Sequence, residues 1–256
     1  MKIRILGGHN IETKDTSCTT ILVDDMLAVD AGALTGNLSN KEQLNLKAVL
    51  LSHQHYDHIR DIPLLGMNFY LQEKTIEIYT TRHVYEILTT QLLNEILYPD
   101  FTKRPEEKPA LHFTTIEPSK TVQIAGYSVL PIQVNHAVPT VGYQITSSEG
   151  KKVFITADTG PGLEDCWRQI SPDLLLIETT LVNKDEDFAL KSGHLTPALL
   201  QTELESFRRI KGYLPQVVLV HINPLVEKDI KTEISEVEKA LHIKIQFGYE
   251  GMKISI

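Results

Sequence analysis

Three histidines and an aspartate within six positions constrain this chain more than any other feature. They occur, after the apolar run Ala48–Leu51 that predicts a buried strand, in the segment Ser52-His53-Gln54-His55-Tyr56-Asp57-His58. Side chains two apart on an extended backbone point the same way, so His53 and His55 can bind one metal ion from one side. Asp57 and His58 are adjacent and diverge, which favours a second ion beside the first. A single HxH pair is common in solvated loops, but four candidate ligands after a strand favour a metal site.

The chemical types of the ligand atoms limit which metals the site can bind. Imidazole nitrogen with carboxylate oxygen, and no thiolate, suits zinc, manganese or iron and gives no reason to expect a soft-metal cluster. Ligand type alone does not separate these three, and zinc is the first choice. The expected cofactors are therefore two divalent metal ions.

Composition indicates an ordinary globular protein. The chain has 256 residues, of which 42% are hydrophobic and 23% charged, and no repeat or linker divides it, so a single domain over 1–256 is expected. Cys18 and Cys166 do not make a disulfide framework. No apolar run is long enough to span a bilayer, and the N-terminus turns polar too early for a signal peptide. We therefore expect a cytoplasmic protein with no membrane partner.

The distribution of charge indicates which kinds of partner the protein can bind. The formal net charge of -8 argues against a broad grip on a nucleic-acid backbone, which needs clustered Lys and Arg. The tight basic cluster Arg208, Arg209 and Lys211 is interpreted as a solvated helix end. A small anion held by metal ions is compatible with an acidic protein. A homodimer is possible, because it is the commonest assembly of soluble oligomers, but the sequence gives no evidence on oligomeric state beyond that base rate.

Alternating and apolar runs predict strands throughout the chain. We expect them over residues 2–7, 19–24, 26–30, 47–52, 76–79, 111–115, 121–124, 127–134, 141–146, 152–156, 173–178, 216–221, 244–247 and 252–255. Helical periodicity predicts helices over 58–71, with Asp57 as N-cap, and over 83–97, 163–170, 197–210 and 227–241. The Pro-rich segment 98–110 is a candidate lid. This order fits an α/β (α+β) fold in which two sheets pack face to face with helices outside, a four-layer αββα sandwich.

Further candidate ligands follow other predicted strands. His136, Asp158 and His221 each lie at or just beyond a strand end, as the segment at 53–58 does. All of them can therefore meet at one edge of the sandwich. His9 is a weaker candidate for the rim of the site, and Tyr143 is as well explained by the core as by substrate contact.

These residues together resemble the metallo-β-lactamase superfamily of dinuclear hydrolases, over nearly the whole chain. The resemblance rests on HxHxDH at 53–58 and, in this order, on His136, Asp158 and His221. It implies that His53, His55 and His136 bind one metal, that Asp57, His58 and His221 bind the other, and that Asp158 bridges both. The ions would lower the pKa of a water molecule that attacks the substrate. Asp rather than Cys at position 158 favours the phosphodiesterase side of the superfamily.

Two more motifs are similar to the class II cyclic-nucleotide phosphodiesterases. They are Ser192-Gly193-His194-Leu195-Thr196-Pro197 with Glu178 in Ile177-Glu178-Thr179-Thr180 upstream, and Val220-His221-Ile222-Asn223-Pro224. Asn223 departs from the HIKP that is common in that family, and His58-Ile59-Arg60-Asp61 lacks its usual Gly after DH. An imidazole is a suitable proton donor near neutral pH, so His194 can protonate a departing alkoxide, and Glu178 can fix its tautomer. The expected catalytic residues are His194, Glu178 and Asp57.

The resemblance implies hydrolysis of a 3′,5′-cyclic nucleotide, with cyclic AMP as the first candidate. A tRNA 3′-end endonuclease shares the ligand set and the GHxT-type histidine, but the Gly/Pro-rich arm that usually clamps tRNA in that family is not found in this sequence. The third alternative is a non-hydrolytic di-metal protein, either a redox di-iron module or a scaffold. The redox version needs a flavin domain, and a scaffold would be expected to have lost ligands.

Overall fold

Two seven-stranded sheets form the centre of the molecule, and the computed structural model describes all residues 1–256. The first sheet has the order β14-β1-β2-β3-β4-β5-β6. Its strands are β1 (Lys2–Gly7), β2 (Thr20–Val23), β3 (Leu27–Val29), β4 (Ala48–Leu50), β5 (Ile76–Thr80), β6 (Leu111–Thr115) and β14 (Lys253–Ser255). Strands β3 to β6 run parallel to one another, whereas β14, β1, β2 and β3 pair antiparallel.

The second sheet has the order β13-β12-β11-β10-β9-β8-β7. Its strands are β7 (Val122–Ile124), β8 (Tyr127–Val134), β9 (Thr140–Thr146), β10 (Lys152–Ile155), β11 (Leu174–Glu178), β12 (Gln216–Val220) and β13 (Ile245–Phe247). Strands β10 to β13 are parallel, and β7, β8, β9 and β10 pair antiparallel. The segments that end β8, β10, β11 and β12 therefore all leave the sheet at the same edge.

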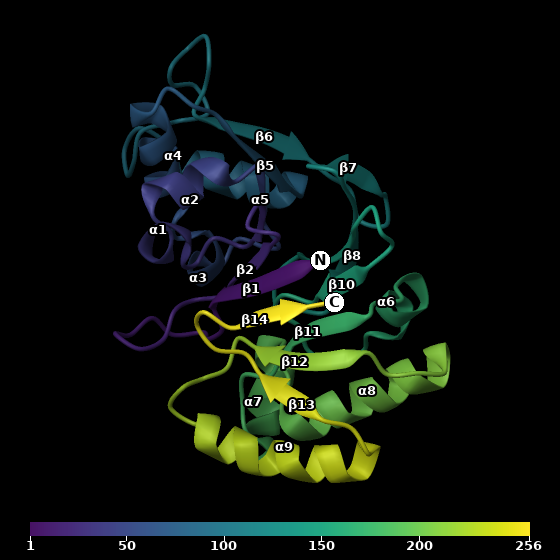
Figure 1. The fold of residues 1–256 in the computed structure, drawn as a ribbon. Coiled ribbons are helices and arrows are strands. Elements are labelled where there is room, and N and C mark those ends of the chain that lie inside the picture. Colours follow the sequence, from purple (N-terminus) through teal and green to yellow (C-terminus); the bar gives the residue numbers. More distant parts are fainter.

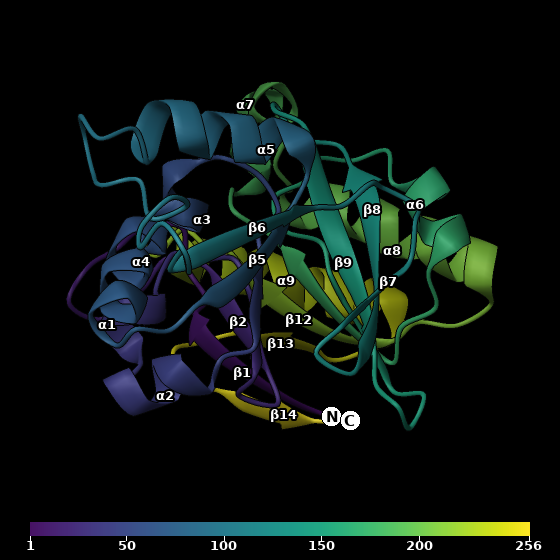
Figure 2. The ribbon, with the colours of Figure 1, turned by 90° about the horizontal axis from the view of Figure 1, so that it is seen from above.

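Helices cover the outer face of each sheet (Figure 1, Figure 2). On the first sheet they are α1 (Leu34–Asn37), α2 (Asn40–Asn45), α3 (Tyr56–Ile59), α4 (Ile62–Leu71) and α5 (Arg82–Ile87), which continues into the π-helical turn η1 (Leu88–Leu92). On the second they are α6 (Glu164–Gln169), α7 (Glu186–Ser192) after the short 3₁₀ turn η2 (Asn183–Asp185), α8 (Pro197–Lys211) and α9 (Glu227–Leu241). No helix combines the length and apolar character that crossing a membrane requires.

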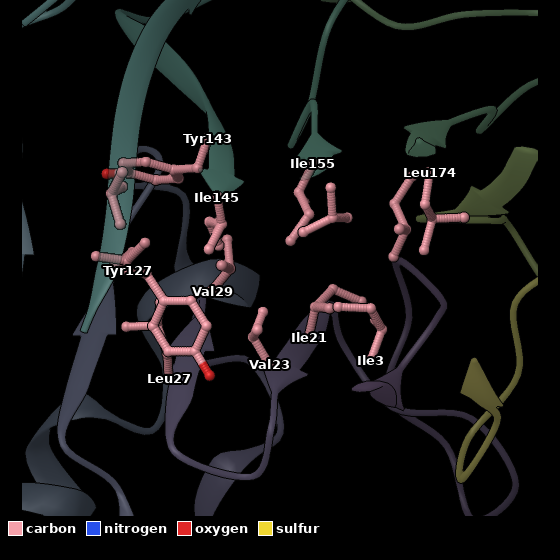
Figure 3. Packing of buried hydrophobic residues seen from close by; sticks show 14 of the residues in the cluster. Ile3, Ile21, Val23, Leu27, Val29, Tyr127, Tyr143, Ile145, Ile155 and Leu174 are labelled. Atoms are coloured by element: carbon pink, nitrogen blue, oxygen red, sulfur yellow. The ribbon is translucent and has the colours of Figure 1, made fainter. Parts of the chain in front are cut away.

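The main core lies between the two sheets. Figure 3 shows side chains of the first sheet, such as Ile3 and Val29, facing Ile145, Ile155 and Leu174 of the second. Separate apolar clusters join each sheet to its own helices. These four layers confirm the predicted αββα sandwich, and burial of apolar surface on both faces of each sheet explains why so many strands are continuous apolar runs.

The helices differ from the prediction at several points. The helix expected over 58–71 begins at Tyr56 and is interrupted at Arg60 and Asp61, because the Asp61 N–H donates to the carbonyl of Ala31 at 2.9 Å. The Asp57 N-cap is wrong, because the N-cap residue is His55 and no side chain caps this helix. The helix expected over 83–97 ends early, because the Asn94 side chain accepts hydrogen bonds from the N–H groups of Ile96 and Leu97.

Two short helices, α1 and α2, and helix α7 were not expected from the sequence. Helix α2 has a capping box, in which Ser39 and Glu42 satisfy each other's backbone N–H groups. Helix α7 lies between Glu178 and His194, in a segment for which no helix is predicted. In the candidate lid 98–110, Asp100 and Phe101 are buried and Phe101 belongs to the core of the first layer, so the start of this segment is anchored to the fold.

Candidate metal centre

The edge at which parallel strands end collects the candidate ligands. His53 and His55 follow β4 of the first sheet, and helix α3 carries Asp57 and His58. Three further residues follow strands of the second sheet: His136 after β8, Asp158 after β10 and His221 after β12. The structure therefore brings all seven residues predicted as ligands to one place, from both sheets.

Four of these residues form one group around a shared point. The potential ligand atoms of His53, His55, His136 and Asp158 lie within 4.8 Å of one another. The Nε2 atom of His136 is 3.2 Å from Nδ1 of His55, and Nε2 of His53 is 3.7 Å from Oδ2 of Asp158. Three imidazoles and one carboxylate oxygen are a donor set that suits a divalent transition metal.

A second group lies directly beside the first and consists of Asp57, His58 and His221. The Oδ2 atom of Asp57 is 3.3 Å from Nε2 of His221 and 3.5 Å from Nε2 of His58. Asp158 contacts this group as well, with Oδ1 3.2 Å from Nε2 of His58 and Oδ2 3.4 Å from Nε2 of His221. Asp158 thus lies between the two groups, with both carboxylate oxygens directed into them.

The buried polar atoms of this cluster fit bound cations. Nε2 of His53, Nε2 of His58 and Oδ1 of Asp158 are buried and have no hydrogen-bond partner within the protein. Such unpaired buried atoms are costly unless another group satisfies them. Three histidines have the other ring nitrogen engaged: Nδ1 of His53 lies 2.9 Å from the Ser52 hydroxyl, Nδ1 of His58 lies 2.8 Å from Asp30, and Nδ1 of His136 lies 2.8 Å from the carbonyl of Gly193. These contacts leave Nε2 free to face the cluster centre, the arrangement usual for metal-binding histidines.

The pKa shifts of the cluster residues are compatible with the binding of cations. Burial lowers the pKa of His53 well below its usual value and lowers the pKa of His136, so both rings are neutral, as metal binding requires. Burial alone would raise the pKa of Asp158, but the rings of His221 and His58 outweigh it and lower that pKa. Burial alone would lower the pKa of His58, but Asp158 and Asp30 raise it. The cluster holds carboxylate charge that cations can neutralise.

His194 and Glu178 form a pair at the border of the cluster, where potential ligand atoms of His194, Asp158 and His221 also lie within 4.8 Å of one another. Nδ1 of His194 is 2.7 Å from Oε1 of Glu178, and the His194 ring stacks on His221 with centroids 5.4 Å apart. Glu178 is fully buried and also accepts hydrogen bonds from the N–H groups of Thr159 and Leu195. Burial alone would lower the pKa of His194, but Glu178 outweighs it and raises the pKa to about 9. The ring is held at Nδ1, so Nε2 is the atom free to exchange a proton.

Two glycines allow the close approaches that shape the cluster. A Cβ atom on Gly32 would lie 2.1 Å from the carbonyl oxygen of Asp57, so the loop after β3 can pass against α3 only without a side chain. Gly193 has φ +72°, and a Cβ there would lie 2.7 Å from the Ala137 N atom. Its carbonyl is the acceptor for His136, so this glycine brings the His194 segment against a candidate ligand.

Two buried residues that support the cluster were not identified from the sequence. Asp30, at the end of β3, accepts hydrogen bonds from the N–H and hydroxyl of Ser52 and contacts His58. Thr180 lies between the two halves of the site, with its hydroxyl 3.0 Å from Glu178 and 2.8 Å from Nδ1 of His221. The available signals were an aspartate directly before Ala31-Gly32-Ala33 and a hydroxyl two positions after Glu178 on the same segment.

Tyr143 and His9, the two weaker candidates for the site, do not contact the cluster. Tyr143 is fully buried in the core between the sheets and donates its hydroxyl to the carbonyl of Leu51, so it is a core residue. His9 is buried and contacts Glu250 at 2.7 Å, not the cluster. Asn223 accepts a hydrogen bond from the Leu225 N–H in the turn before α9.

An αββα sandwich with two adjacent His/Asp groups at the shared strand edge defines a metal-dependent hydrolase of the metallo-β-lactamase fold. A family model described as "Beta-lactamase superfamily domain" matches residues 19–222. The chain therefore belongs to the β-lactamase superfamily, as its motifs predicted.

Two curated proteins are related to the chain in sequence. The octanoyltransferase of Porphyromonas gingivalis is 24% identical over 217 residues, covering 83% of this chain and 38% of that protein. The 3′,5′-cyclic-nucleotide phosphodiesterase 1 of Saccharomyces cerevisiae is 21% identical over 185 residues, covering 62% of this chain and 50% of that protein. The chain thus spans half or less of the length of these curated relatives.

Solved structures agree on the fold. Unliganded yeast PDE1 superposes with a TM-score of 0.86 at 17% identity, covering 100% of this chain and 99% of that chain. The short form of human tRNase Z superposes with a TM-score of 0.69 at 17% identity, with 100% and 99% covered. At these identities the likeness shows a shared fold.

Proposed function

We propose that this protein is a dinuclear metal-dependent phosphodiesterase that hydrolyses 3′,5′-cyclic nucleotides, cyclic AMP first among them, to 5′-nucleoside monophosphates. The observation that carries the proposal is the His194–Glu178 pair, which places a proton donor directly beside two groups of candidate metal ligands. The sequence similarity to the 3′,5′-cyclic-nucleotide phosphodiesterase 1 of yeast supports the same substrate class.

In this proposal, His53, His55 and His136 hold one ion, Asp57, His58 and His221 hold the other, and Asp158 contacts both. Zinc is the expected metal, with manganese and iron as alternatives. When bound, the two ions would neutralise charge on the phosphate oxygens and lower the pKa of an attacking water molecule. The phosphate would then lie at the cluster, beside His194, whose ring stacks on the candidate ligand His221.

His194 supplies the proton that the leaving group needs. Its pKa of about 9 keeps the ring protonated at neutral pH, and Glu178 holds Nδ1, so the proton available for transfer is on Nε2. As the bond between phosphorus and the 3′-oxygen breaks, Nε2 gives its proton to that oxygen, and the product keeps its phosphate on the 5′-oxygen. Glu178 then stabilises the ring in the tautomer with its proton on Nδ1.

The decisive test compares three substrates with the zinc-loaded protein and its Asp158→Ala variant: 3′,5′-cyclic AMP, bis-(p-nitrophenyl) phosphate and a precursor tRNA. The proposal expects cyclic AMP to be opened efficiently and the activity to be lost in the variant. Cleavage of the generic diester without cyclic AMP would move the substrate to another diester. Cleavage of the precursor tRNA in preference to cyclic AMP would show that the protein is a tRNA 3′-endonuclease instead. The net charge of -8 argues against that alternative.

A second variant separates proton donation from metal binding. His194→Ala should keep both metals and lower kcat by about 10²- to 10⁴-fold, the range usual for a general acid. Metal content measured by atomic emission provides the control. Turnover as fast as that of the unmodified protein would show that His194 is not the proton donor.

A further inference from the structure

A cavity of about 560 Å³ opens between helices α1, α3 and α4 and the segment that follows η1. Tyr56 lines it and lies in the chain directly between two candidate ligands, His55 and Asp57. One wall of the cavity is therefore formed by α3, the helix that also carries the candidate ligands Asp57 and His58. Its volume falls within the range of about 300–1,000 Å³ that is usual for small-molecule sites.

The charged groups in this cavity already have partners. The Arg60 guanidinium contacts Glu12 at 3.0 Å through Nη1 and Asp61 at 3.3 Å through Nε. The other oxygen of the Asp61 carboxylate accepts a hydrogen bond from the N–H of Thr35 at 2.6 Å. The cavity therefore offers no free charge to a second phosphate or to an ammonium group, and it suits an uncharged ligand.

The remaining walls are apolar and aromatic. Leu64 is 47% exposed, Leu97 is 65% exposed and Tyr56 is 63% exposed, although large apolar side chains usually gain by burial. Tyr98 lines the same cavity. A flat aromatic ligand would cover these side chains, and stacking of nucleic-acid bases on aromatic residues is a general, sequence-tolerant mode of binding.

We propose that this cavity binds the base of the nucleotide substrate while its phosphodiester lies at the metal centre. The inference rests on the proposed function for the phosphate position, but the affinity of the cavity for a nucleobase can be measured separately. In this proposal, Arg60 and Asp61 are positioning residues in the wall of the cavity.

Helix α4 provides a matched pair of variants. Leu64 and Leu71 are exposed leucines on the same helix, and only Leu64 lines the cavity. Leu64→Gln should weaken the binding of adenosine, measured by titration NMR, by about tenfold, because one apolar contact with the base is lost. Leu71→Gln should bind adenosine as the unmodified protein does. The KM for cyclic AMP should rise in parallel in Leu64→Gln, with kcat within about twofold.

Leu97→Gln, on the opposite wall, repeats the test should Leu64→Gln fail to fold. Absence of adenosine binding by the unmodified protein, or equal affinity in the Leu64 and Leu71 variants, would overturn the inference. A change in oligomeric state of Leu64→Gln with unchanged adenosine affinity would also overturn it and assign this surface to a protein contact. Selective loss of adenosine binding in a protein that does not hydrolyse cyclic AMP would retain the inference and refute the proposed reaction.

Discussion

The Asp30 carboxylate shows how single residues organise the candidate metal centre. All of its contacts are to Ser52 and His58, and Ser52 in turn lies 2.9 Å from Nδ1 of His53. Asp30 adopts φ +60°, a conformation that aspartate tolerates better than most residues. One buried carboxylate therefore fixes the ring orientation of two candidate ligands, one in each group.

Asp30→Asn should lower the affinity for zinc by about 10- to 100-fold while the protein stays folded. The amide keeps the shape of the carboxylate but replaces one acceptor oxygen with a donor, so His58 loses the charge that orients its ring. Competition with a chromophoric zinc chelator measures the affinity. Asp100→Asn is the matched control, because Asp100 is also buried but interacts with Thr102 and Lys103 instead. An unchanged zinc affinity in Asp30→Asn would contradict this account.

His9 gives the protein a pH-dependent contribution to stability. Its Nδ1 atom is 2.7 Å from Glu250, and its Nε2 atom is 3.7 Å from Glu227 of α9. Burial lowers the pKa of His9, but the two glutamates outweigh it and raise the pKa above 6.5. A raised pKa in the folded state means that this contribution is complete below the unfolded-state pKa and is lost as the pH rises through the folded-state pKa.

His9→Gln should therefore reduce the free energy of unfolding most at about pH 5.5, with a smaller penalty at about pH 9. The pKa of Glu250 is lowered from 4.5 in the folded state. At still lower pH its carboxylate becomes protonated, and the contribution of the His9–Glu250 pair to stability is lost as well. Urea unfolding at a series of pH values measures the difference. His112→Gln serves as the control, since the His112–Glu77 pair is exposed and such pairs contribute little. A penalty that grows with pH would contradict the sign.

At the residue scale, the seven candidate ligands could be predicted because their types and spacing carry the chemistry. The residues that orient them could not, since Asp30 and Thr180 act through contacts between segments far apart in the sequence. The Asp57 cap failed for a related reason. Asp57 suits an N-cap by type, but its carboxylate is directed toward His221 and His58 of the cluster.

At the scale of elements, Glu203 of α8 anchors the loop that follows Asp158. Its buried carboxylate accepts hydrogen bonds from the N–H of Gly162 at 2.7 Å, the N–H of Leu163 at 3.3 Å and the indole of Trp167 at 2.9 Å. Helix α6 and the end of the loop that leads from Asp158 to it are thus fixed to helix α8. The anchor connects packing on the outer face of the second sheet to the position of a candidate ligand.

Glu203→Gln should lower the free energy of unfolding by about 1–3 kcal/mol, because an amide offers one acceptor oxygen to three buried donors. Trp167 is the only tryptophan, so its fluorescence during urea unfolding reports on this contact directly. Glu205→Gln, two positions along the same helix and exposed, should have little effect. Equal losses in the two variants would show that the buried contacts do not matter.

Every strand expected from the sequence overlaps a strand of the structure, because apolar runs in a sheet buried on both faces are distinctive. Short helices were less predictable. Helix α2 is polar, with a capping box as its only local signal, and α7 lies in a charged segment without a clear apolar face. The π-helical turn η1 follows a pattern that also fits an ordinary helix, so periodicity could not separate the two.

At the scale of the whole molecule, the candidate metal centre joins the two halves of the sandwich. Helix α3 and the segment before it bring four ligands from the first sheet, whereas His136, Asp158 and His221 come from the second. Without cations, the contacts across this edge include unpaired buried nitrogens and a buried carboxylate oxygen. Bound ions would replace these unsatisfied groups with bonds that connect both sheets, so metal binding and folding should be thermodynamically linked.

Removal of metal should therefore destabilise the whole fold. With free zinc at about 1,000 times its dissociation constant, linkage predicts that the free energy of unfolding rises by about 4 kcal/mol over the chelated protein. Urea unfolding with zinc and with a chelator measures the difference, and adding zinc back should restore the midpoint. Asp158→Ala removes the residue that contacts both groups, so its stability should respond much less to zinc. If the unmodified protein and the variant gained equally from zinc, the stabilising ions would bind elsewhere. If neither gained, the two sheets would be held together by their apolar core alone, and the cluster at the strand edge would not be a metal centre.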